Sequence, residues 1–104
     1  MFGFGKKVVS DQMVGMISLE IAMFESWRLE NLGKGLPDNE IEYLARAILD
    51  RENYKYTDTH IMQMKLSLIT GFPEDKIKQM RAQHNFDSQV VSFCNSVNAS
   101  HLLQ

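Results

Sequence analysis

Apolar side chains recur at the three- and four-residue spacing of an α-helix along almost the whole chain. No stretch shows the strict alternation of apolar and polar residues that marks a half-buried β-strand. An amphipathic helix can bury its apolar stripe only against another element, so a chain with this pattern must pack helix on helix. Its 104 residues are enough for one such core, and we expect a single all-α domain over residues 1–104.

The first helix is expected to organise the rest of the fold. It should run from about Ser10 to Asn31, with Ser10 as the N-cap and Gly33 just beyond the last turn. Apolar residues occupy both sides of this helix, which is more than a surface helix needs. The helix is therefore either central to the fold or paired with another chain. We predict a compact orthogonal bundle of about five helices around this long N-terminal helix.

Further helices are predicted by capping residues and apolar spacing. They are expected to start near Pro37 and Pro73, and after a cap at Thr57 or Asp58 and a cap at Asp87 or Ser88. Residues 1–9 and 98–104 lack the helical periodicity and are expected to be flexible ends. The side chains expected to form the core are Phe24, Trp27, Ile41, Leu44, Ile48, Leu68, Ile77 and Phe93.

Two segments, 35–41 and 71–77, match position by position, each with a glycine, a proline and an acidic residue before an isoleucine. We interpret the match as the same helix-start chemistry used twice. A solenoid repeat is the alternative, but two copies are fewer than such arrays need to be stable.

Charge and cysteine content exclude several classes of protein. Eleven basic and 13 acidic side chains give a net charge of -2, which favours neither nucleic acid nor an anionic membrane. The one cysteine, Cys94, permits no intramolecular disulfide, so a reducing cytoplasm is the expected location. Polar residues interrupt every apolar run before it reaches the length of a signal peptide or a membrane span. We expect a cytoplasmic protein without a membrane span.

No arrangement of residues predicts catalysis. The chain has no glycine-rich phosphate loop and no order of residues typical of a nucleophile with its base. Cys94 lies on an apolar stripe, where burial disfavours its thiolate. In the His-x-Met-x-Met string, only His60 and Met64 would share a helix face, and methionines at this spacing are usually core residues rather than copper ligands. We therefore expect no enzyme, no cofactor and no metal site.

Glu20 is the residue whose position most needs an explanation, because it lies within the apolar face of the first helix. A carboxylate there is either exposed or requires a partner, such as Arg46, Arg81 or a histidine, unless its pKa rises until it is neutral. We interpret Glu20 as a paired structural residue. A ligand-anchoring or acid–base role is the alternative.

The composition of the first helix favours a non-enzymatic interaction module, an adaptor or regulator that binds another protein or a second copy of itself. Its apolar width exceeds what one small core readily covers, and methionines provide adaptable contact surface. The residues expected to form the interaction surface are Met13, Met16, Glu20, Met23 and Trp27.

The alternative is a helix-turn-helix regulator that binds DNA, with residues 73–84 as its reading helix. The side chains that would meet phosphates and base edges are Lys76, Lys78, Gln79, Arg81 and Gln83. Glu74 and Asp75 argue against this role, since they place carboxylates at the start of the helix, where phosphates would lie.

Overall fold

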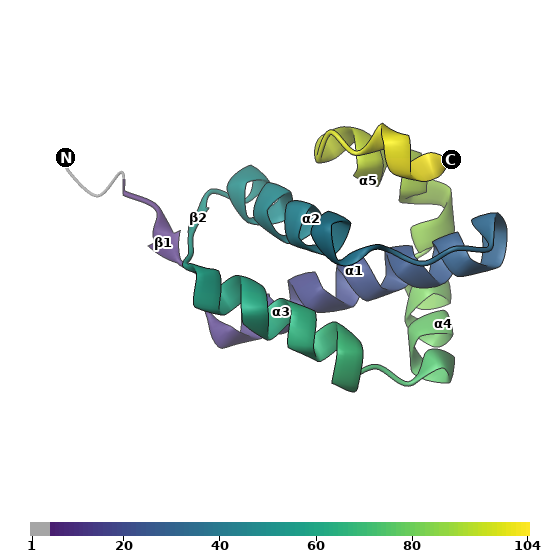
Figure 1. Ribbon diagram of the computed structural model, residues 1–104, viewed down its shortest axis with the longest axis horizontal. Coiled ribbons are helices and arrows are strands. Elements are labelled where there is room, and N and C mark those ends of the chain that lie inside the picture. The colour runs from purple at the N-terminus through teal and green to yellow at the C-terminus, as the bar shows by residue number, and fades with distance from the viewer. Residues whose placement is uncertain (1–4) are drawn as a thin grey trace.

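A long central helix carries the remaining elements of the fold (Figure 1). The structure, a computed structural model, describes residues 5–104. The central helix α1 (Asp11–Leu32) contacts α2 (Asp38–Arg51), α3 (Asp58–Thr70) and α4 (Glu74–Gln83). The chain ends in a short helix, α5 (Val90–Ser96), between two 3-10 helices, η1 (Phe86–Gln89) and η2 (Ser100–Leu103). The all-α class predicted from the sequence is confirmed.

The limits of α1 are set by the residues that the sequence predicted. The Ser10 side chain caps the helix, accepting a hydrogen bond of 3.2 Å from the Met13 backbone N–H. Gly33 ends it in the left-handed conformation, with φ of 72°, which a glycine adopts without steric cost. Both sides of α1 are apolar because its neighbours cover it from several directions. Of the two alternatives for this helix, the structure places it at the centre of the fold.

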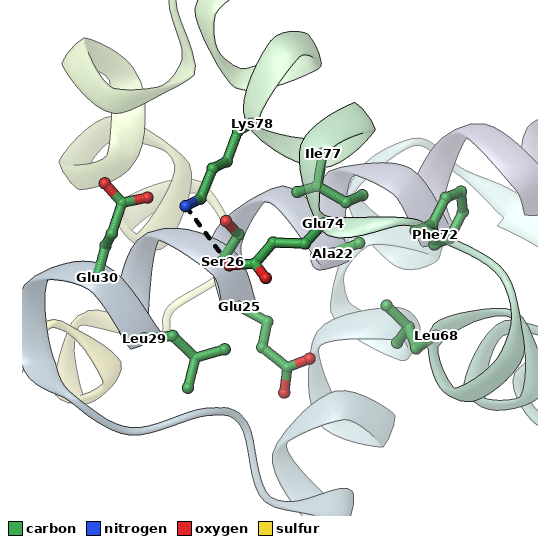
Figure 2. A pocket seen from close by; sticks show the side chains of 10 residues that line it. All are labelled: Ala22, Glu25, Ser26, Leu29, Glu30, Leu68, Phe72, Glu74, Ile77 and Lys78. Atoms are coloured by element: carbon green, nitrogen blue, oxygen red, sulfur yellow. Dashed lines mark ion pairs between the residues drawn. The ribbon is translucent and has the colours of Figure 1, made fainter.

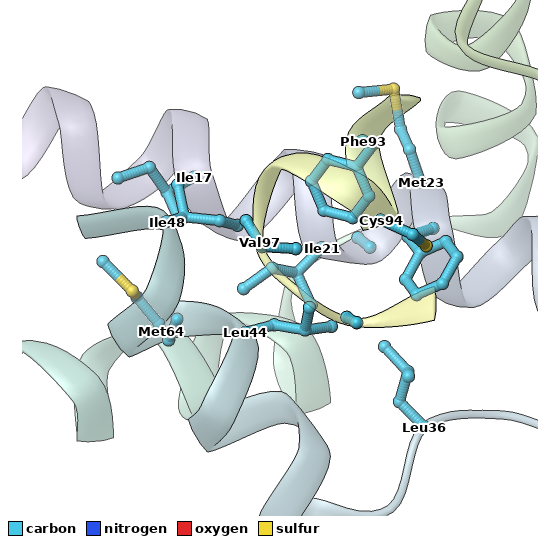
Figure 3. Packing of buried hydrophobic residues seen from close by; sticks show 14 of the residues in the cluster. Ile17, Ile21, Met23, Leu36, Leu44, Ile48, Met64, Phe93, Cys94 and Val97 are labelled. Atoms are coloured by element: carbon cyan, nitrogen blue, oxygen red, sulfur yellow. The ribbon is translucent and has the colours of Figure 1, made fainter. Parts of the chain in front are cut away.

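The core lies where α2, α3 and α5 meet α1 (Figure 3). Ile21, Phe24 and Leu44 have no exposed surface, and Phe93 of α5 packs on Phe24 with ring centroids 5.3 Å apart. Burying side chains of this size provides most of the free energy of folding in a domain this small. Among the predicted core residues, Phe24, Leu44, Ile48, Ile77 and Phe93 are buried, whereas Trp27, Ile41 and Leu68 are half-buried at its edge.

Helices α2 and α4 begin in the same way, as their matching sequences suggested. Pro37 and Pro73 are the N-caps, and their carbonyl oxygens accept hydrogen bonds from Ile41 and Ile77 at 3.0 and 3.1 Å. Helix α3 instead begins with a capping box, in which the Thr57 backbone N–H donates to His60 Nδ1 at 3.0 Å. These local signals explain why the helix starts were readable from the sequence.

Two strands of two residues each were not predicted. β1 (Lys7–Val8) pairs in parallel with β2 (Tyr54–Lys55), and the Val9 N–H extends the pairing to the Lys55 carbonyl at 3.0 Å. Strands this short show no alternating pattern, and their partners are far apart in the sequence, so no local signal reveals them. Residues 7–9 are therefore held in place within the segment 1–9 expected to be flexible, while residues 1–4 lie outside the described part.

The end of the chain, residues 98–104, also differs from the expected flexible tail. Ala99 and Leu102 are buried, and the Leu102 carbonyl accepts a hydrogen bond from Arg28 Nε at 3.0 Å. The Tyr43 hydroxyl donates to the Asn98 carbonyl at 2.9 Å. No periodic pattern marks this segment, because η2 is a 3-10 helix of four residues, too short to show a helical repeat of apolar residues.

Candidate interaction surfaces

Four of the five residues predicted to form the interaction surface line one groove. The groove lies between α1, the end of α2 and the end of α4, and it encloses about 250 Å³. We call it the methionine groove, and the residues that matter here are Met13, Met16, Glu20, Met23, Arg51, Glu52 and His84. Trp27 lies outside the groove and stacks on Phe24, with ring centroids 6.1 Å apart.

The predicted residues differ in how much surface they present. Met16 is 56 % exposed, whereas Met13 and Glu20 are half-buried. Met23 is only 6 % exposed and belongs to the core, so expecting it on the surface was wrong. Met23 belongs to the same buried cluster as Phe86 and Phe93, and the helical pattern of the sequence alone does not reveal that these C-terminal residues reach α1. The surface that a partner could contact is therefore a narrow strip, in which Met16 is the most exposed methionine.

Glu20 is half-buried at the side of the groove and pairs with Arg51 of α2. The nearest guanidinium nitrogen lies 3.6 Å from Glu20 Oε1. Burial raises the pKa of Glu20, and the positive charge of Arg51 offsets part of this rise. The partner is none of those expected, because Arg46 pairs with Glu42 and Asp58 instead. The pairing supports the structural interpretation of Glu20.

On α4, four of the five residues predicted to meet DNA are exposed, and one is not. Lys76, Lys78, Gln79 and Gln83 face solvent, and Lys78 Nζ lies 3.5 Å from Glu74 one turn earlier. Arg81 is only 6 % exposed, so its predicted place on the outer face is wrong.

The Arg81 guanidinium is instead the centre of a polar cluster at the end of α4. Its Nε and Nη2 donate to the two carboxylate oxygens of Asp87, at 3.0 and 2.7 Å. Nη1 donates to the Ser26 hydroxyl at 3.0 Å and to Glu30, both on α1. The hydrogen bonds that Arg81 donates to the Asp87 and Glu30 carboxylates raise the pKa of Arg81. This arginine ties α4 to α1: four of its five N–H groups are used in these hydrogen bonds, and its burial keeps the guanidinium away from a phosphate at the surface.

The arrangement of α3 and α4 also differs from a DNA-binding helix-turn-helix. In that motif the two helices pack against each other. Here each packs mainly on α1, and the two make few contacts with one another. Gly71 and Pro73 provide the turn between them, as predicted. Helices α3 and α4 nevertheless pack separately on α1 (Figure 1).

A second hollow lies between α1, the end of α3 and the start of α4 (Figure 2). It encloses about 380 Å³. Its floor is apolar, formed by Ala22, Leu29, Leu68, Phe72 and Ile77. Its rim carries Glu25, Glu30 and Glu74, with Lys78 as the one cation among its lining residues. We call it the acid-rimmed hollow. The sequence did not predict this hollow, although Leu29 on the second side of the first helix indicates that this side also has apolar surface.

The remaining candidate groups have structural explanations. Cys94 is fully buried, and burial raises its pKa to about 11, so the thiol stays protonated. Met64 is fully buried while Met62 is 61 % exposed, so the two do not face one another. His60 caps α3, and His101 Nε2 lies 3.0 Å from Glu40. Among residues 5–104, no three His, Cys, Asp or Glu side chains gather as metal ligands would.

No family model, curated protein or solved structure matches this chain. None of the described helices combines the length and the apolar character needed to cross a membrane.

Proposed function

We propose that the protein is a small non-enzymatic interaction module, an adaptor or regulator, whose methionine groove binds an amphipathic helix of another protein. The observation that carries the proposal is that Met13, Met16 and Glu20 line one groove with Arg51 and His84. Methionine side chains adapt to differently shaped partners, and grooves of this kind commonly hold the apolar face of a helix.

Charged groups beside the apolar strip would fix the orientation of a bound partner helix. Glu20 and Arg51 lie 3.6 Å apart with side chains 32 % and 29 % exposed, so each can still meet a partner's polar group. Glu52, 46 % exposed, extends the acidic side of the groove. A partner helix with an apolar ridge and a flanking polar residue fits the methionine groove. The ridge would contact Met16, and the polar residue would contact Glu20 or Arg51.

A second copy of the chain is a poorer occupant. A stable dimer buries roughly 800 Å² on each partner. The groove offers one apolar side chain that is more than half exposed, Met16, while Met23 and most of Trp27 are covered. A short helix bound transiently needs far less area than a dimer. We further propose that the module works in the cytoplasm, since its one cysteine is a buried thiol.

The test is a photo-crosslinking residue placed at position 16 in cells that express the protein, with position 62 as the matched control. Met16 and Met62 are both methionines, 56 % and 61 % exposed, but Met62 belongs to α3 and does not line the groove. We expect a discrete adduct with another protein from position 16 and not from position 62.

The captured protein is then produced and titrated calorimetrically against purified variants. Met16→Asp should weaken binding by about tenfold, the effect of removing one buried apolar contact, while Met62→Asp should leave it unchanged. Adducts that are equal at both positions, or that contain only a second copy of this chain, would contradict the proposal.

A further inference from the structure

The acid-rimmed hollow is a second surface with a different chemical character from the methionine groove. Its floor combines buried and half-buried side chains, Ile77, Leu68 and Phe72, with Leu29, which is 55 % exposed. The floor faces outward between α3 and α4 (Figure 2). At about 380 Å³ the hollow can take several side chains of a partner.

Each of the three carboxylates at the rim has one oxygen in contact with a group of the described part of this chain and one oxygen without such a contact. Glu25 Oε2 accepts a hydrogen bond of 2.9 Å from the Leu36 N–H, and Glu30 Oε2 accepts one from Arg81. Glu74 Oε1 lies 3.5 Å from Lys78 Nζ. Within residues 5–104, the second oxygen of each of these carboxylates has no side-chain or backbone donor.

The charges around the hollow do not cancel. Three carboxylates and one ammonium line it. Arg81, which also contacts Glu30, pairs with Asp87 at 2.7 Å, and these two charges cancel one another. Two negative charges therefore remain beside an apolar floor. Glu30 and Glu74 are 52 % and 79 % exposed, so a ligand can reach them without rearrangement.

We propose that the acid-rimmed hollow binds a basic amphipathic segment of a partner protein. An apolar side chain of the segment lies on Leu29 and Phe72, and lysine or arginine side chains one turn away meet Glu74 and Glu30. A small organic cation is a poorer occupant, because small ligands are usually bound with most of their surface buried. This hollow leaves Leu29 and the rim carboxylates widely exposed. The proposal concerns a separate surface and does not depend on the methionine groove.

The test uses a fluorescein-labelled helical peptide of leucine and lysine, and a second peptide in which every lysine is glutamate. Binding to the purified full chain is followed by fluorescence anisotropy. We expect the leucine–lysine peptide to bind and the leucine–glutamate peptide not to bind. Binding should weaken as salt rises, because the rim charges are exposed and are screened.

Matched variants assign the binding to this hollow. Leu29→Ser should weaken binding by about tenfold through the lost apolar contact, while Val91→Ser, at a site 59 % exposed on α5, should not change it. Glu74→Gln should weaken binding by about threefold at low salt, while Asp75→Asn, in the same first turn but outside the hollow, should have no such effect.

Melting curves followed by circular dichroism check that each variant is folded. Equal binding of the two peptides, or wild-type affinity of Leu29→Ser, would overturn the proposal. Met16→Asp should bind the peptide like the wild type, so failure here is distinguishable from failure of the methionine groove.

Discussion

Glu20 combines two opposing effects at one carboxylate. Removing it from water favours its neutral form, and Arg51 at 3.6 Å favours its charged form. Desolvation is the larger effect, so the pKa of Glu20 in the folded protein lies above its ordinary value. A carboxyl group of this kind binds its proton more tightly in the folded state than in the unfolded state. Ionisation of Glu20 therefore lowers the stability of the fold.

The pH dependence of Glu20→Gln tests this reasoning. As pH rises through the ordinary pKa of a glutamate, about 4.3, the unfolded chain ionises first and the wild type loses stability. The loss is complete above the raised pKa of the folded state. Glutamine cannot ionise, so Glu20→Gln should equal the wild type in stability at low pH and exceed it at neutral pH. Urea denaturation at about pH 3.5 and about pH 7 measures the difference.

Glu74→Gln is the control, since the Glu74 side chain is 79 % exposed and lies outside the methionine groove, and it should show no such pH dependence. A Glu20→Gln variant less stable than the wild type at neutral pH would contradict the expectation and would mean that the Arg51 pair outweighs desolvation. If Glu20→Gln also keeps the affinity for a partner of the groove, the carboxylate is a structural residue.

Two buried arginines mark what the sequence could not reveal at this scale. Arg81 meets Ser26 and Glu30, 55 and 51 residues earlier in the sequence, and Arg28 donates to the Leu102 carbonyl, 74 residues later. Arginine on a polar helix is normally exposed, so periodicity alone places Arg81 outside. Its burial follows from partners distant in sequence, which no local pattern contains.

At the scale of elements, the glycine inside α1 has room for a larger side chain, whereas the glycine of the α3–α4 turn does not. Gly15 lies inside α1, and an added Cβ would meet nothing within 4 Å. Gly71 has an ordinary φ of -117°, but an added Cβ would lie 2.7 Å from the Ser67 carbonyl oxygen. Gly71 is therefore required by a close approach of the backbone and not by its dihedral angles.

The two alanine variants should shift stability in opposite directions. Gly15→Ala should stabilise the protein by about 1 kcal/mol, because alanine loses less conformational freedom in a helix. Gly71→Ala should destabilise it by about 1–2 kcal/mol, because the end of α3 must move to relieve the contact. Thermal melting of the two variants measures both, and a stabilising Gly71→Ala would show that the turn relaxes without cost.

Helix α4 gives the prediction that separates the proposed module from the DNA-binding alternative. Its arginine is committed to Asp87 and Glu30, and Glu74 and Asp75 stand at its start. We expect no anisotropy change with a labelled random-sequence duplex at about 50 mM or about 200 mM salt. Binding in the micromolar range that is lost at the higher salt and in Lys76→Gln would restore the helix-turn-helix hypothesis.

Element boundaries were predictable where a capping residue stands next to an apolar stripe. Ser10, Pro37, Thr57 and Pro73 each begin the helix expected of them. Which surfaces stay uncovered was not predictable, because that depends on where α5 and η2 pack. Met23 was expected outside for this reason, and the acid-rimmed hollow needs side chains from three helices that only the fold brings together.

At the scale of the whole molecule, the last residues fasten the end of the chain to the centre. Leu102 is 4 % exposed and its carbonyl binds Arg28, while Tyr43 and Glu40 of α2 hold Asn98 and His101. Arg28 also donates to the Gly35 carbonyl in the connection between α1 and α2. The buried Arg28 guanidinium thus joins the connection between α1 and α2 to η2.

Leu102→Ala tests whether this closure contributes to stability. Removing a buried leucine side chain costs about 2–4 kcal/mol when the surroundings relax only partly. Urea denaturation should therefore show a lower midpoint for Leu102→Ala, whereas Val91→Ala, at a site 59 % exposed on α5, should change stability by about 0.5 kcal/mol or less. Hydrogen exchange should be slow at the Leu102 amide, which donates to the Ala99 carbonyl at 2.9 Å. If Leu102→Ala is as stable as the wild type and this amide exchanges at once, residues 98–104 form the flexible end that their sequence suggests.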